Sequence, residues 1–110
     1  MGFFDSLAKA ASSAGASIKK ANIDKIEKLW KDMDRLSTSR LADLCKERGV
    51  DDMAGCLAFL KLRQKGSQHS VSLNSEEMES VRDKADFIKR TIELSEGRAF
   101  SEIRETMNGL

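Results

Sequence analysis

The side chains best suited to chemistry in this chain of 110 residues are two cysteines and one histidine. Structural zinc sites use four ligands of this kind, usually arranged as two close pairs along the chain. Cys45 and Cys56 lie 11 residues apart, and His69 is the only histidine. This spacing does not fit a zinc site, so we predict neither a metal nor any other cofactor.

The two cysteines have a simpler interpretation. Each falls on the apolar stripe of a predicted helix, where cysteine behaves as a small hydrophobic residue. We predict that Cys45 and Cys56 are both core residues, and a regulatory disulfide is the alternative. His69 lies in the polar stretch 66–74, so we expect it to be solvated rather than catalytic.

Patterns that would indicate catalysis are missing from the sequence. A nucleophile needs a base beside it, and general acid–base catalysis needs a positioned histidine or a desolvated pair of carboxyl groups. The acidic residues fall on polar helix faces, and no phosphate-binding loop, dinucleotide-binding fingerprint, zinc-protease helix or nucleophile elbow occurs. We therefore predict that the protein is not an enzyme.

The composition favours helices along the whole chain. There is no proline to interrupt them, and β-branched and aromatic residues never alternate over a run long enough for a sheet. The length fits a single domain. We predict an all-α fold, a compact bundle of four to five helices with an N-terminal amphipathic helical arm.

Helix caps and apolar spacing place one bundle domain over residues 22–110. Asn22 is predicted to cap the first bundle helix, and Asp51 to cap the helix that follows a turn at Gly49. The serines and threonine of residues 37–39 separate these two parts of the chain. The expected central core residues are Trp30, Leu44, Leu57, Leu60, Val81, Ile88 and Ile92.

The longest predicted helix begins near Asn74 and ends before Gly97. Its apolar residues recur every three or four positions, as one face of a helix requires. We expect Phe87, Thr91 and Leu94 to widen this face enough for a bundle core.

Residues 1–21 form the predicted amphipathic arm. Its apolar stripe contains Phe3, Phe4, Leu7 and Ile18, and Lys19 and Lys20 follow directly. At roughly 100° per residue, this stripe is rotated by about 80° from the stripe of residues 23–33. One straight helix could not bury both stripes against one partner, so we predict a mobile arm or a bend near residue 21.

An amphipathic arm of this kind is typical of proteins that bind a surface. Apolar anchors at helical spacing fit a groove on another protein, and aromatic residues beside lysines also anchor helices at a membrane interface. Packing on the protein's own bundle is a third possibility. The predicted contact residues are Phe3, Phe4, Leu7, Ile18, Lys19 and Lys20.

We therefore predict a non-enzymatic interaction or regulatory protein of the cytoplasm. Its expected partner is another protein, bound through the arm or a face of the bundle, and self-association is an alternative. A peripheral membrane protein anchored by residues 1–21 is a further alternative. No apolar stretch approaches the roughly 20 residues that a membrane span needs.

A small DNA-binding protein is the last alternative. Residues 41–50 read Leu-Ala-Asp-Leu-Cys-Lys-Glu-Arg-Gly-Val, which resembles the first half of a helix-turn-helix, and residues 41–63 resemble the SAP motif, a DNA-binding helix hairpin. The turn is one residue longer than SAP spacing, and the recognition helix would begin with two aspartates. The basic contacts on this reading are Lys46, Arg48, Lys61, Arg63 and Lys65. The net charge of +1 argues against nucleic acid as a partner.

Overall fold

A computed structural model describes residues 19–110, and these residues are all-α. Their five α-helices cover residues 19–33, Thr38–Arg48 (α2), Met53–Gln64 (α3), Ser75–Thr91 (α4) and Arg98–Met107 (α5). A short 3-10 turn, η1, covers Gln68–Ser70 between α3 and α4. The prediction of an all-helical bundle is confirmed for this part of the chain.

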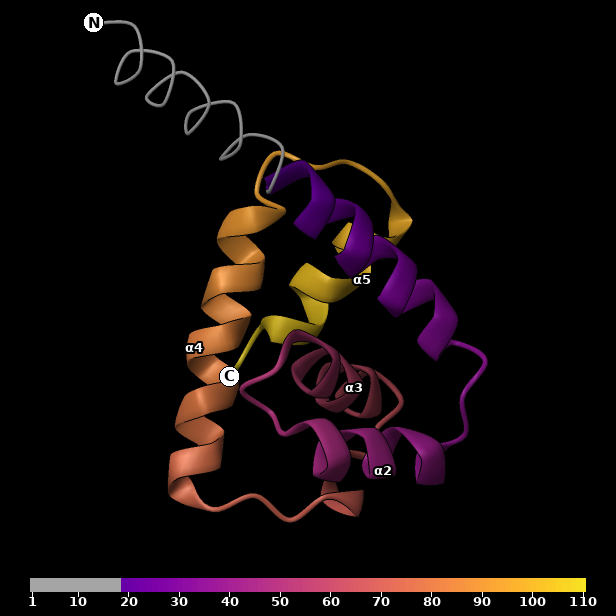
Figure 1. Ribbon diagram of the computed structural model, residues 1–110, viewed down its shortest axis with the longest axis vertical. Coiled ribbons are helices and arrows are strands. Elements are labelled where there is room, and N and C mark those ends of the chain that lie inside the picture. Colours follow the sequence, from indigo (N-terminus) through magenta and orange to yellow (C-terminus); the bar gives the residue numbers. More distant parts are fainter. Residues whose placement is uncertain (1–18) are drawn as a thin grey trace, which may run out of the picture.

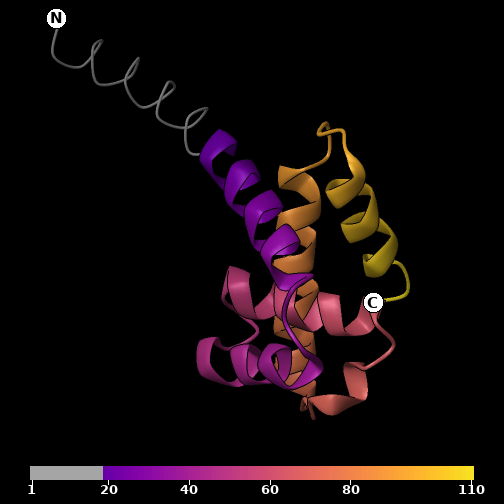
Figure 2. The same cartoon turned by 90° about the vertical axis from the view of Figure 1, so that its right-hand side faces the viewer.

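The helix α3 lies at the centre of the bundle. Figure 1 shows it end-on, with α4 on one side, the 19–33 helix on the opposite side and α2 beneath. In the perpendicular view, α5 lies on the far side of α4 from the 19–33 helix (Figure 2). Every other helix therefore contributes to covering α3.

The sequence of α3 explains this central position. All eight residues of Gly55–Leu62 are buried, including the one charged residue among them. A helix that is apolar around its whole circumference is stable only inside a protein, because no side of it gains from contact with water. The amphipathic helices α4 and α5 instead bury one face each.

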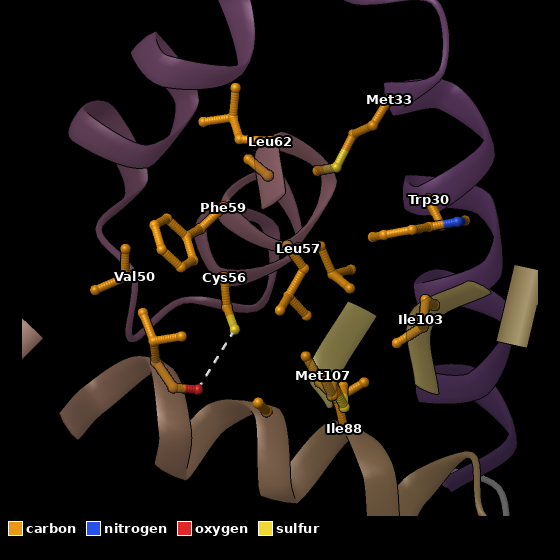
Figure 3. Packing of buried hydrophobic residues seen from close by; sticks show 14 of the residues in the cluster. Trp30, Met33, Val50, Cys56, Leu57, Phe59, Leu62, Ile88, Ile103 and Met107 are labelled. Carbon is orange, nitrogen blue, oxygen red and sulfur yellow. Dashed lines mark hydrogen bonds between the residues drawn. The ribbon is translucent and has the colours of Figure 1, made fainter. Parts of the chain in front are cut away.

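The core contains most of the residues predicted for it. Trp30, Leu57, Leu60, Val81, Ile88 and Ile92 are all at most 1% exposed, whereas Leu44 is only half-buried at the edge of the core. Figure 3 shows how Trp30 and Met33 of the 19–33 helix approach Leu57 of α3 from one side, with Ile88 and Met107 beneath. Apolar spacing alone thus located the centre of the bundle.

Two of the predicted caps need correction. Residues 19–33 are helical without interruption, so Asn22 lies inside a helix and does not cap one. Lys19, Lys20 and Ala21 have good helix propensity, and nothing there breaks the backbone hydrogen-bond ladder. The cap of α3 is Asp52 rather than Asp51, because the Asp52 carboxylate accepts the backbone N–H of Ala54 at 3.1 Å.

The start of α4 is fixed by a reciprocal cap. The Asn74 side chain accepts the backbone N–H of Glu77 at 2.8 Å, and the Glu77 carboxylate accepts the N–H of Asn74 at 3.2 Å. This capping box satisfies two backbone donors at once. The predicted beginning of the longest helix is therefore confirmed.

A close contact between two glycines joins α2 to α3. Gly49 ends α2 with φ +81°, a left-handed conformation, and its N–H donates to the Cys45 carbonyl. A Cβ atom on Gly55 would lie 1.9 Å from the Gly49 carbonyl oxygen. The turn can pass this close to α3 only because residue 55 has no side chain.

We expect Gly55→Ala to lower the free energy of unfolding by about 3 kcal/mol, since the added methyl forces the α2–α3 turn apart. The control is Gly66→Ala, which has φ +74° but no atom within 4 Å of the added Cβ. The Gly66→Ala variant should lose only about 1 kcal/mol of unfolding free energy, which is the cost of placing alanine in a backbone conformation with positive φ. Urea denaturation measures both, and equal losses in the two variants would contradict the steric explanation.

Candidate interaction surface

Two large hydrophobic side chains of α4 and the turn after it lie on the surface. Phe87 is 44% exposed and Leu94 is 89% exposed, and they are the exposed large hydrophobic residues within residues 19–110. We call these two residues the Phe87–Leu94 patch. The expectation that they widen the core is therefore wrong, and only Thr91 of that group is buried.

The geometry of α4 explains this outcome. Val81, Ala85 and Ile88 face the core, and Phe87 is rotated by about 200° from Ala85 at 100° per residue. The helix ends at Thr91, so Leu94 lies in the following turn and no longer follows the helical stripe. Counting apolar residues overestimated the width of the buried face.

Phe87 borders a shallow hollow. The hollow has a volume of about 330 Å³ and is lined by Asp51, Ser80, Asp83, Lys84 and Phe87. The Lys84 ammonium lies 5.2 Å from the centre of the Phe87 ring, which is within range of a cation–π interaction. The exposed part of the Phe87 ring can therefore pack against an apolar side chain that enters this hollow.

The 19–33 helix begins at the same end of the bundle at which α4 ends. In Figure 1 the first turn of the 19–33 helix overlaps the C-terminal end of α4 and the loop that follows it, whereas in Figure 2 this loop lies on the other side of α4 from that turn. Thr91 is buried at the end of α4, one helical turn from Phe87, and its hydroxyl donates to the Phe87 carbonyl at 2.8 Å. Leu94 belongs to the same loop.

The structure locates the predicted contact residues only in part. Lys19 and Lys20 are exposed in the first described turn. Phe3, Phe4, Leu7 and Ile18 lie outside the described residues.

The predicted DNA-contacting residues do not form one surface. Lys46 and Arg48 are exposed on α2, whereas Lys61 is completely buried in α3. Arg63 is half-buried and donates to the backbone carbonyls of Thr106 and Asn108 at 3.0 and 2.9 Å. Lys65 is exposed and donates to the Leu36 carbonyl at 3.0 Å.

Lys61 is part of a polar cluster that ties α3 to the 19–33 helix. Its ammonium pairs with the Asp34 carboxylate, donates to the Gln64 amide oxygen at 3.0 Å, and lies 3.8 Å from the centre of the Trp30 ring. The Asp34 side chain is 58% exposed, so only the lysine end of this ion pair is removed from water. The prediction that Lys61 contacts DNA is therefore wrong for this residue, because its side chain is buried. Its charge instead stabilises the packing of α3 against the 19–33 helix.

The cluster predicts an asymmetric response to mutation. Asp34→Asn leaves the buried Lys61 charge without its counter-ion and should cost about 2 kcal/mol of unfolding free energy. Lys61→Met removes the buried charge and keeps the packing on Trp30, so it should cost less than about 1.5 kcal/mol. Urea denaturation of both variants tests this order, and a larger loss for Lys61→Met would contradict it.

The two cysteines are buried thiols. Burial raises the pKa of Cys45 from its ordinary value of 9.0 to about 11, partly offset by a backbone hydrogen bond. Burial also raises the pKa of Cys56 to about 12, with Lys84 lowering it and Cys45 raising it further. The Cys56 thiol donates to the Val81 carbonyl at 3.8 Å (Figure 3). Their predicted place in the core is confirmed, and reactive thiols require the opposite pKa shift.

These pKa values predict a loss of stability in alkali. The unfolded chain releases the thiol protons near pH 9, whereas the folded protein keeps them to about pH 11 for Cys45. The unfolding free energy should therefore fall as the pH rises from 9 towards 11. Replacing both cysteines by alanine should weaken the dependence of the unfolding free energy on pH between pH 9 and about pH 11. Unchanged pH dependence in that double variant would contradict the assignment.

Residues 19–110 hold no group of three or more histidine, cysteine or acidic side chains arranged to bind a metal ion. None of the helices described there has the length and apolar character to cross a membrane.

Sequence reasoning missed the Phe87–Leu94 patch. The available signal for Leu94 was the helix end: Ile92 is the last core residue before the loop, and Gly97 limits how far the helix can continue. Comparisons with protein-family models, with curated proteins and with solved structures found no match for this chain.

Proposed function

We propose that this chain is a non-enzymatic interaction protein that binds another protein through the Phe87–Leu94 patch together with its N-terminal arm. The observation that carries the proposal is the exposure of these two large apolar side chains, 44% and 89%, on α4 and in the turn after it. Burying a leucine or phenylalanine side chain contributes about 1.5–3 kcal/mol. The patch therefore supplies a centre of binding energy that the folded bundle leaves unused.

The patch is too small to act alone. Stable protein interfaces bury about 800 Å² on each partner, far more than two side chains can provide. In this proposal the apolar residues of the arm, Phe3, Phe4 and Leu7, contribute the remaining area of the interface. Aromatic residues are frequent at the energetic centres of interfaces.

Other observations favour binding over catalysis. The pKa values of both thiols are raised, whereas a catalytic thiol needs a lowered pKa. Arg63 and Lys65 are already bonded to backbone carbonyls of their own chain, and Lys61 is buried, which weakens the DNA-binding alternative. The exposed apolar patch is therefore the surface that best supports a function.

Affinity capture from the native host tests the proposal. We expect the full chain to retain a defined protein, and Phe87→Ser with Leu94→Ser to reduce its recovery about tenfold, the equivalent of 1.4 kcal/mol. The control Lys89→Ser changes an exposed residue of the same helix and should leave recovery unchanged. Circular dichroism checks that all variants fold.

Equal recovery by the serine variants and the wild type would contradict a role for the patch. The peripheral membrane alternative is tested in parallel by flotation with anionic vesicles at low salt, where amphipathic helices bind most strongly. Flotation of the full chain, combined with no captured protein, would replace the proposal by that alternative.

A further inference from the structure

We infer that a hollow between residues 30–34 and the start of α5 binds a small ligand through its carboxylate group. The hollow has a volume of about 360 Å³ and is lined by Trp30, Lys31, Asp34, Arg98, Ala99 and Glu102. Small-molecule sites usually have volumes of about 300–1,000 Å³. None of the lining residues belongs to the Phe87–Leu94 patch, so this site goes beyond the proposed function.

The indole N–H of Trp30 is a buried donor that has no acceptor among residues 19–110. Trp30 is 1% exposed, and Figure 3 shows its nitrogen at the end of the ring that is turned away from Leu57. The Lys61 ammonium beside the ring face is itself a donor, so it cannot satisfy the indole N–H. Because a buried donor without a partner destabilises the protein, a ligand that brings an acceptor to Trp30 is bound favourably.

The N-terminus of α5 supplies a second group of donors. Its cap residue, Gly97, has no side chain, and the first turn of α5 contains no acidic residue. The Ser101 N–H donates to the Gly97 carbonyl, so the N–H groups of Arg98, Ala99 and Phe100 precede the hydrogen-bond ladder of the helix. The first two of these residues line the hollow. Free N–H groups at the positive end of a helix dipole favour a bound anion.

The charges around the hollow favour an anion with a single negative charge. Lys31 and Arg98 have exposed side chains that can turn towards an anion. The acidic residues of the lining already have cationic partners, since Asp34 pairs with Lys61, and Glu102 lies 3.6 Å from the Arg98 guanidinium. These two carboxylates still repel a doubly charged phosphate more strongly than a carboxylate. A carboxylate also has two oxygens, one for the indole N–H and one for the N-terminus of α5.

NMR titration of the full chain with sodium acetate at neutral pH tests the inference. Trp30 is the only tryptophan, so its indole N–H gives a single, separate signal. We expect this proton to move downfield and to reach a plateau, with half of the change at an acetate concentration on the order of millimolar. The backbone amide signals of Ala99 and Phe100 should shift over the same concentration range. Sodium chloride at equal ionic strength is the reference and should cause no saturable shift.

Variants locate the site. Arg98→Gln removes one cation from the lining and should raise the half-saturating acetate concentration about threefold, as expected for an exposed ion pair. The matched control Arg90→Gln removes an exposed cation of α4 that does not line the hollow, and it should leave this concentration unchanged. Trp30→Phe removes the indole donor and should abolish the saturable shift of the Ala99 amide. Circular dichroism checks that each variant folds.

An indole shift that never saturates, or one that chloride reproduces, would overturn the inference. Saturable acetate binding that survives unchanged in Trp30→Phe or in Arg98→Gln would also overturn it, because the carboxylate would then bind elsewhere. Half-saturation by phosphate at a lower concentration than by acetate would overturn the assignment to a carboxylate.

Discussion

The whole bundle depends on the burial of α3 on every side. An apolar helix of this kind is stable only when its neighbours remove all of it from water, so each neighbour must present a matching face. Gly55 lets the α2–α3 turn come close, Val81 and Ile88 of α4 cover another side, and Trp30 closes the third. The positions of the other helices follow from this single requirement.

The one buried charge fits the same constraint. Lys61 lies on a helix that has no exposed face, yet its side chain is long enough to bring the ammonium to Asp34 at the edge of the bundle. Its aliphatic stem packs as a hydrophobic residue would, and the charge is satisfied by the carboxylate, an amide and an aromatic ring. Sequence reasoning placed Lys61 on the surface because a lysine at a helix end is usually solvated.

Periodicity predicted the helices well because it reports burial directly. The stripes of α4 and the residues around Trp30 identified the core, and the Asn74 cap identified where α4 begins. Periodicity failed where a helix stopped: Leu94 continues the pattern in sequence but lies beyond Thr91, the last residue of α4. It also failed at Asn22, because a residue that can cap a helix can equally lie within one. The candidate surface needed three-dimensional information, since it joins one helix and the turn after that helix.

The burial of Lys61 has a practical consequence for following this protein in solution. Reagents that acylate surface amines, and trypsin, reach a lysine side chain only when it is accessible. Most lysines on the described helices are exposed, so they would react at once, whereas Lys61 would react only after α3 separates from Trp30. The rate of modification at this one residue therefore reports how often the bundle opens.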